Sequence, residues 1–298
     1  MPGLINRETP GGESCSPGFG RLSPVAALAR RHDRDRYQTA LFAPARRREA
    51  LFALYAFNYE IARVRETVSE PVLGQIRLQW WRENIAAAFE GGPVRPHIVV
   101  EALTDVIRAC ALTRAHFERL VDAREGDLGE ASWASLAALE DYAEATSAGL
   151  VYLALESLGV RQPSAEKAAC HIGIAYALAG LLRAMPFQAR SGRMIVPADI
   201  AAQTGLESTD YRALRSTPAL RRAVATIAAA AIRHLGAARI QRGSIPRSAL
   251  PALLSGIIAE RSLWRLKRAA YDPFDSALAV PDAMQSWRLA IASLRGRF

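Results

Sequence analysis

The stretch GIAYALAGLLRAMPFQARSGRMIVP, Gly173 to Pro197, decides how this chain of 298 residues is interpreted. Its first half belongs to a predicted helix in which apolar side chains cover more than one face, over 172–187. A helix that is apolar all round is buried. The segment 51–61 shares this property. We therefore expect these two helices to lie at the centre of the protein and to line whatever cavity it has.

The rest of the chain is also predicted to be helical. Alanine dominates, β-branched residues rarely follow one another, and no alternating apolar and polar run predicts a sheet. Glycine and proline mark the breaks, and no linker divides residues 21–298, so we expect a single all-α domain. The predicted helices span 22–36, 45–67, 71–90, 95–110, 113–125, 132–158, 163–190, 218–242, 246–271 and 282–296.

The charge balance is basic. Half of the residues are apolar and 22% are charged, and the net charge of +9 comes mostly from arginine. A basic field suits phosphates, nucleic acid or an anionic membrane surface, but a genome that favours arginine codons explains it equally well. No zinc-finger, RNP or helix-turn-helix signature points to nucleic acid, so we expect no nucleic-acid partner.

Cysteine and histidine are sparse. Three widely spaced cysteines predict a reducing compartment without disulfides, and the five histidines show no metal-ligand spacing. The cysteines are Cys15, Cys110 and Cys170, and the histidines are His32, His97, His116, His171 and His234.

The first residues and the apolar segments bear on location. Residues 1–20 are rich in glycine, proline and serine and lack the apolar core of a signal peptide, which predicts a flexible leader. No stretch approaches the ~18–20 uninterrupted apolar residues of a membrane span. We expect a cytoplasmic protein that is soluble or lies on a membrane surface.

The segment 173–197 resembles the second active-site segment of the squalene/phytoene synthase family, roughly GxAxQLTNILRDVxEDAxxGRxYLP, without a gap. PARRREALFALYAFNYEIARVRE, Pro44 to Glu66, is similar to that family's first active-site helix. QWWRENI at 79–85 and the segments 139–159 and 250–274 extend the resemblance over nearly the whole chain, from about Tyr37 to Phe274. The resemblance implies an isoprenoid synthase-type helical bundle around a central cavity.

In that family, pairs of acids on two facing helices hold Mg²⁺, which bridges to the substrate diphosphate and neutralises it as it leaves. Acids four residues apart share a helix face, so each motif presents a pair. The aligned positions here are Ala62, Arg63 and Glu66 in the first motif and Ala184, Phe187 and Gln188 in the second. The resemblance therefore implies a catalytically degenerate protein with no catalytic residue, no metal and no cofactor.

An active enzyme remains the alternative. A divergent prenyltransferase that condenses prenyl diphosphates with magnesium would need acids from elsewhere, and Glu60 and Glu66, six residues apart, sit ~120° from each other on a helix and form no pair. Asp127-Leu128 does match a DL that the family carries after its middle helix. The acids that could contribute are Glu60, Glu66, Asp122 and Asp127.

Four polar residues match family positions: Arg48, Tyr55, Arg183 and Arg193. The resemblance implies that such arginines hold diphosphate, and without magnesium the pocket would still suit an anion or a prenyl lipid. The alternative is a structural role, at helix-end carbonyls or beside buried carboxylates.

Two segments resemble one branch of the family in particular. They are LRAMPF, 182–187, and AFNYEIARVRETVSEPVLGQIRLQWW, 56–81. That branch contains the mitochondrial factor needed to assemble respiratory complex I and its bacterial relatives. The resemblance implies an assembly or scaffolding factor with complex I subunits or assembly intermediates as partners, at the cytoplasmic face of the inner membrane.

The C-terminal segment 282–298 has the pattern of a short basic interfacial helix. Trp287, Ile291, Leu294 and Phe298 fall on one face, and Arg288, Arg295 and Arg297 lie off it. A second basic face carries Arg261, Arg265 and Arg268 beside Trp264. We expect the C-terminal face to meet an anionic membrane; the alternative is that both helices pack on the domain with their arginines in water.

Overall fold

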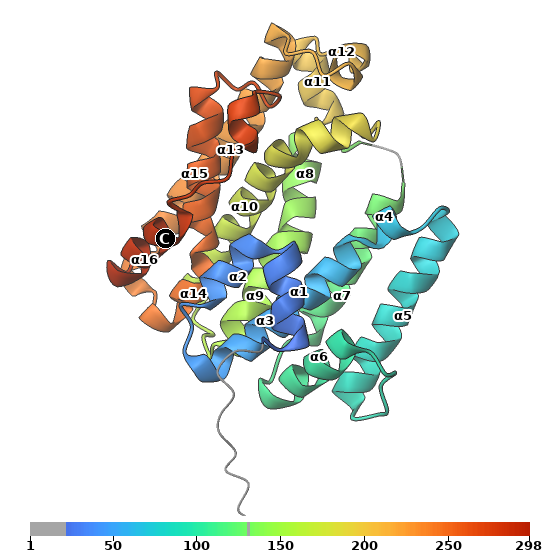
Figure 1. The fold of residues 1–298 in the computed structure, drawn as a ribbon, viewed down its shortest axis with the longest axis vertical. Coiled ribbons are helices and arrows are strands. Elements are labelled where there is room, and N and C mark those ends of the chain that lie inside the picture. Colours follow the sequence, from blue (N-terminus) through green and yellow to red (C-terminus); the bar gives the residue numbers. More distant parts are fainter. Residues whose placement is uncertain (1–21, 130–131) are drawn as a thin grey trace, which may run out of the picture.

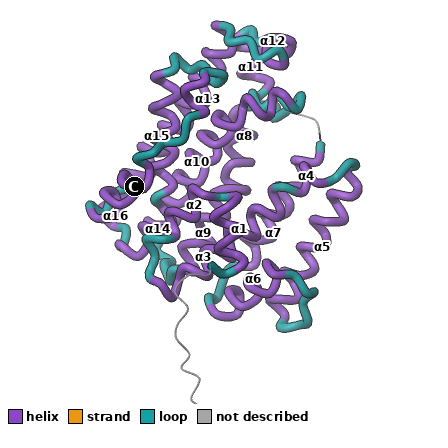
Figure 2. The backbone as a smooth tube through the Cα atoms, in the orientation of Figure 1, coloured by secondary structure: helices purple, strands orange, loops and turns teal. Residues whose placement is uncertain are grey.

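A computed structural model describes residues 22–129 and 132–298. Within these ranges the chain forms helices and no strand, which confirms the all-α prediction (Figure 1 and Figure 2). The predicted leader, 1–20, lies outside the described residues. The α-helices are α1 (Pro24–His32), α2 (Arg34–Ala40), α3 (Ala45–Ala62), α4 (Val64–Thr67), α5 (Pro71–Glu90), α6 (Ile98–Ala109), α7 (Arg114–Glu125), α8 (Leu136–Ala143), α9 (Gly149–Ser157), α10 (Pro163–Arg190), α11 (Ala198–Thr204), α12 (Ser208–Arg212), α13 (Pro218–Ile240), α14 (Leu250–Leu253), α15 (Ser255–Arg268) and α16 (Gln285–Leu294).

Local sequence signals account for the best-predicted helices. The bounds predicted for α5 and α10 are confirmed. Both begin at a proline, which has no N–H group to leave unsatisfied in the first turn. α5 ends before Gly91, whose φ of 73° is the left-handed conformation that glycine adopts at low cost. α13 begins where the Thr217 hydroxyl accepts a hydrogen bond from the Leu220 N–H at 3.2 Å.

Two predicted helices are split. The helix predicted at 22–36 breaks at Asp33, whose carboxylate accepts a hydrogen bond from the Arg36 N–H at 3.2 Å and so caps a new helix, α2. The helix predicted at 45–67 breaks at Arg63, where ψ is −5°. The turn there starts α4 and places Val64 in the core, 1% exposed.

Other boundaries also differ from the prediction. The helix predicted at 132–158 begins at Leu136 and contains a π-helical turn, Glu144–Ala148. The segment predicted as one helix over 246–271 consists of a 3₁₀ turn followed by α14 and α15, which meet at Leu254. The short helices α11 and α12 are missing from the prediction, because five to seven residues are too few to show apolar periodicity.

α10 runs through the middle of the bundle and packs against α9, α13 and α15 (Figure 1). Its first half joins an apolar cluster with α3, and its second half joins another with α13. Between 51 and 61, α3 is buried everywhere except at Tyr59. The prediction that these two helices are central is confirmed.

The π-helical turn Glu144–Ala148 explains the first residue of the quoted motif. Gly173 lies so close to this turn that a Cβ atom there would be 2.3 Å from the Ala148 Cα. Only glycine permits that approach. The close contact fixes the position of α10 relative to the turn.

Two helices are long and apolar enough to cross a membrane by length and composition, although neither is an uninterrupted apolar run. They are α10 and α13, in which 61% and 44% of the apolar window lies buried in the bundle. The two pack against each other. Their hydropathy therefore matches their place as core helices.

Candidate functional site

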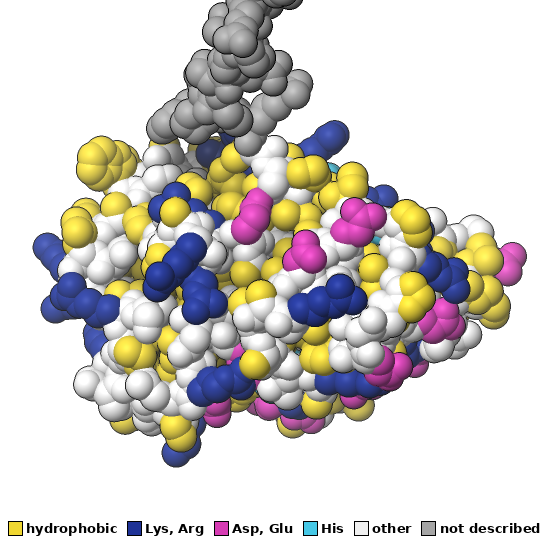
Figure 3. Space-filling model, turned by 90° about the horizontal axis from the view of Figure 1, so that it is seen from below, with side chains coloured by type: hydrophobic (Ala, Val, Ile, Leu, Met, Phe, Trp, Pro, Cys, Tyr) yellow, Lys and Arg dark blue, Asp and Glu magenta, His cyan; other side chains and the backbone are white. Residues whose placement is uncertain are grey.

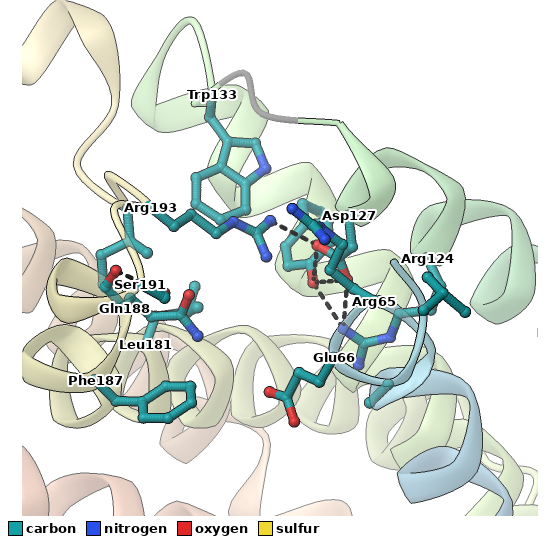
Figure 4. A pocket seen from close by; sticks show the side chains of 14 residues that line it. Arg65, Glu66, Arg124, Asp127, Trp133, Leu181, Phe187, Gln188, Ser191 and Arg193 are labelled. Atoms are coloured by element: carbon teal, nitrogen blue, oxygen red, sulfur yellow. Dashed lines mark hydrogen bonds and ion pairs between the residues drawn. The ribbon is translucent and has the colours of Figure 1, made fainter. Parts of the chain in front are cut away.

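The two degenerate motifs meet at a cavity of about 470 Å³ (Figure 4). Ala62 at the end of α3 and Glu66 in α4 line it from one helix pair, and Phe187 and Gln188 line it from α10. The other lining residues are Arg65, Val68, Arg124, Asp127, Trp133, Tyr142, Leu181, Ser191, Arg193 and Ile195. The cavity thus lies where the family resemblance places the substrate diphosphate.

Three side chains hold the Asp127 carboxylate in the cavity wall. Arg193 donates from Nη2 to Oδ1 at 2.8 Å, and Arg124 donates from Nη1 to Oδ2 at 3.0 Å. The Tyr142 hydroxyl donates to Oδ2 at 2.8 Å and accepts from Arg124 Nη1 at 2.7 Å. These bonds, drawn as dashed lines in Figure 4, form a closed network around one acid.

The network sets the charge state of its members. Burial raises the pKa of Asp127, but Arg124, Arg193 and the Tyr142 hydroxyl outweigh it and hold that pKa below its ordinary value. Burial raises the pKa of Tyr142 well above its ordinary value, so the phenol stays protonated and serves as a donor. Asp127 is therefore ionised at neutral pH, with two guanidinium groups as counter-ions.

The structure does not bring every degenerate position into the cavity. Arg63 turns away and stacks on Tyr59, with its guanidinium carbon 5.3 Å from the ring centre. The Arg63 Nη1 atom also lies 3.7 Å from Glu60 Oε1. Ala184 is half-buried on α10, outside the cavity lining.

The four polar residues that match family positions are dispersed as well. Arg48 donates to the Ala43 carbonyl at 2.9 Å, and Arg183 pairs with Asp35 at 2.9 Å beside a different cavity. Tyr55 is 3% exposed in the core, and burial raises its pKa to about 12. Arg193 alone among them lines the 470 Å³ cavity. Anion binding by any of the four stays a prediction. The contacts of Arg48, Arg183 and Arg193 are of the kind that the structural alternative describes.

Sequence reasoning missed three residues of the site: Arg124, Trp133 and Tyr142. The Arg193 guanidinium lies over the Trp133 ring, 5.7 Å from its centre, which adds a wall to the cavity. Arg124 precedes Asp127 by three residues and pairs with it, and that spacing was the available signal. Nothing local marks Tyr142, which reaches Asp127 only through the fold.

A histidine pair lies away from this cavity. His171 on α10 and His234 on α13 approach with their Nδ1 atoms 2.9 Å apart, and Glu140 lies 3.4 Å from His234 Nε2. Sequence spacing gave no sign of this contact. Among the described residues, no group of three or more histidine, cysteine or acidic side chains could hold a metal ion.

The residues at the cavity do not fit the magnesium site of the family. Among the residues that the structure describes, Glu66 and Asp127 are the two carboxylates that line it, and both Asp127 oxygens already accept from arginine or tyrosine. Three guanidinium groups, those of Arg65, Arg124 and Arg193, line the same space and would oppose a cation. Proteins usually hold Mg²⁺ through one or two carboxylates together with waters and substrate phosphates. The one described carboxylate left to contribute here, Glu66, faces three guanidinium groups.

The predicted membrane-facing residues lie on α16 and at its C-terminal cap, Arg295. Trp287, Ile291 and Leu294 are exposed, and Arg288 and Arg295 line a groove beside α15. Phe298 leaves this face, because α16 ends at Leu294, and it is buried against the Arg242 guanidinium, 5.3 Å from the ring centre.

Comparisons with known proteins identify the family to which this chain belongs. A model of the family described as squalene/phytoene synthase matches residues 29–292. The chain belongs to the squalene/phytoene synthase family. It is similar to a solved dehydrosqualene synthase, with a TM-score of 0.80 and 18% identity over 91% of this chain and 94% of the other. This likeness shows the family fold.

Relatives within the family carry two kinds of name. A Bos taurus protein named NADH dehydrogenase (ubiquinone) complex I, assembly factor 6, is 32% identical over 91% of this chain and 81% of its own length. A Rhodopseudomonas palustris protein named presqualene diphosphate synthase is 25% identical over 72% of this chain and 77% of its own. The family thus includes both an assembly factor and an enzyme that resemble this chain.

Proposed function

We propose that this chain is an assembly or scaffolding factor for respiratory complex I that no longer transfers prenyl groups. Support comes from relatives named as complex I assembly factors, which match over most of their own length and of this chain. The observation that supports a loss of prenyl transfer is the cavity itself, where Ala62, Phe187 and Gln188 stand at positions of family acids. Its partners would be complex I subunits or assembly intermediates.

The chemistry of prenyl transfer supports the second part of the proposal. A diphosphate leaves readily only when cations neutralise its growing charge. Arginines could bind the anion, but Arg124 and Arg193 are already paired with Asp127. The cavity retains apolar walls at Leu181 and Phe187, so we propose that it holds a lipid or isoprenoid as a ligand rather than as a substrate.

The proposed location of the protein in the cell follows from its proposed partner, respiratory complex I. Complex I is assembled in a membrane, so we propose that the protein works at the cytoplasmic face of the inner membrane. No cofactor is part of this proposal.

The experiment is a deletion of the gene with complementation. We expect the deletion strain to lose assembled complex I on native gels, together with its NADH:quinone oxidoreductase activity, and we expect the wild-type chain to restore both. The purified protein, titrated with farnesyl and geranylgeranyl diphosphate with and without Mg²⁺, should show no magnesium-dependent binding and form no product. Normal complex I in the deletion strain would refute the assembly role.

The second candidate function is prenyl transfer. The similarity to a presqualene diphosphate synthase favours it, as does the presence of Glu66 and Asp127 at one cavity. A magnesium-dependent C30 or C40 product in the same titration would establish this alternative. Glu66→Gln should then abolish the product, whereas Glu118→Gln, on the surface of α7, should not.

A further inference from the structure

The outer side of α16 is an exposed apolar stripe. Trp287, Ile291 and Leu294 share one helix face and are 66%, 46% and 78% exposed. The opposite face carries Leu289 and Ala292, which pack into a small apolar cluster with α15. Packing on the domain and exposure of the stripe therefore occur together, on opposite sides of the same helix.

α15 continues this stripe with a second aromatic side chain. Trp264 is 44% exposed, and the guanidinium carbons of Arg261 and Arg268 lie 4.0 Å and 5.0 Å from its ring centre. A groove of about 570 Å³ is lined by both helices. Its lining consists of Ile257, Glu260, Arg261, Trp264, Arg288, Ile291, Ala292, Arg295 and Arg297. We call these residues, with Arg268, Trp287 and Leu294, the α15–α16 surface.

The α15–α16 surface carries an excess of positive charge. Arg261 and Arg288 share Asp282, at 3.2 Å and 3.3 Å. Among the described residues that line the groove, Glu260 is the one acid, and Arg239 binds it at 2.7 Å. Among the described residues, no carboxylate pairs with the remaining arginines of the surface, which are Arg268, Arg295 and Arg297.

The view from below shows this distribution on the whole molecule (Figure 3). On its left side, where α16 lies in Figure 1, dark blue cationic side chains stand among yellow apolar ones. The magenta carboxylates gather mostly at the centre and right of the same view.

We propose that the α15–α16 surface docks on an anionic phospholipid bilayer, with α16 parallel to the membrane plane. Exposed tryptophan and leucine would enter the interface between headgroups and acyl chains, while arginines beside them meet lipid phosphates. A groove that takes a protein helix would not need uncompensated arginines on its rim, whereas an anionic lipid surface is attracted by each of them. This inference rests on the surface alone and not on the proposed function.

The test is flotation of the purified full chain with vesicles. Phosphatidylcholine vesicles are compared with vesicles of phosphatidylcholine and phosphatidylglycerol. We expect the wild type to float with the second kind only, and to be released by high salt. The triple variant Arg268→Gln, Arg295→Gln, Arg297→Gln should bind on the order of 100-fold more weakly, because each arginine near an anionic surface contributes several-fold.

Matched controls separate this surface from general basicity. Three other exposed arginines lie outside this surface: Arg46, Arg190 and Arg212. Their replacement by glutamine should cause a much smaller loss of vesicle binding. Likewise Trp287→Ser with Leu294→Ser should weaken binding, whereas Val72→Ser with Ile76→Ser, also exposed but on α5, should not. Circular dichroism of each variant verifies that it is folded.

Two outcomes would overturn the inference. One is equal weakening by the control triple and the surface triple; the other is failure of the wild type to bind either kind of vesicle. The assembly role is tested separately, by measuring the complex I content of the complemented deletion strain. Vesicle binding without complementation would refute the assembly role and leave the membrane surface standing.

Discussion

At the scale of single residues, Asp127 shows how neighbouring side chains hold an acid in the cavity wall. The sequence keeps an acid where the family has one, yet its carboxylate is occupied by Arg124, Arg193 and Tyr142. An acid of the cavity has thereby become part of an ion-pair network that joins η1 (Gly126–Leu128), α7, α8 and the loop after α10.

We predict that Asp127→Asn destabilises the fold by about 3–5 kcal/mol, because it leaves two guanidinium groups without their partner in a largely buried network. Asp122→Asn is the matched control. Its carboxylate also pairs with an arginine but is 62% exposed, so the expected loss is below about 1 kcal/mol. Urea unfolding followed by circular dichroism measures both.

The same network predicts a pH dependence. The pKa of Asp127 is lower in the folded protein than its ordinary value of 3.8, so its contribution is present above that value and is lost as pH falls through the folded pKa. The stability difference between wild type and Asp127→Asn should therefore shrink below about pH 4. A difference that stays constant down to about pH 2 would contradict an ionised Asp127.

At the scale of elements, the contact between α10 and the π-helical turn fixes the central helix. We predict that Gly173→Ala destabilises the protein by about 2 kcal/mol or more, because the new methyl group would overlap the Ala148 backbone. Gly180→Ala is the matched control on the same helix. Beyond its own helix, no atom lies within 4 Å of the place that its new methyl group would take, so it should stabilise by about 0.5–1 kcal/mol.

Thermal and urea unfolding of the two glycine variants would check the prediction. If both variants were stabilised, helix propensity would dominate and the close approach of Ala148 would carry no cost.

At this scale, some features could be predicted from local sequence, and others depend on contacts between distant segments. The bounds of α5 and α10 follow from local sequence, because a proline begins each helix and Gly91 follows the end of α5. The break at Asp33 needs a cap that competes with helix continuation, and the π-helical turn lies against Gly173, a contact between segments that local sequence does not reveal. The cavity's motif residues follow from aligned segments, but Tyr142 and Trp133 reach it only through tertiary contacts.

At the scale of the whole molecule, α10 belongs to both large apolar clusters. Ile172 lies in the cluster with α3, and Leu178 lies in the cluster with α13. Because a single helix is shared by two clusters, we expect their unfolding to be coupled, as the prediction of one domain over 21–298 requires. That prediction is open to experiment.

We predict that Leu178→Ala lowers the stability of both clusters by the same amount, about 2–5 kcal/mol, because Leu178 is fully buried. Hydrogen exchange measured by mass spectrometry would report on α3 and α13 separately. Equal loss of protection in both helices indicates one cooperative unit. Loss confined to α13 would divide the chain into two folding units.

The α15–α16 surface has a practical consequence for labelling chemistry. The chain contains two lysines, Lys167 and Lys267. Lys267 is exposed and follows Trp264 by three residues on α15, so the two side chains are neighbours on that helix, whereas Lys167 lies near the start of α10. Lys167→Arg would thus leave Lys267 as the sole side-chain amine. A solvatochromic dye attached to it would report what approaches this surface, by its colour, in an otherwise unaltered protein.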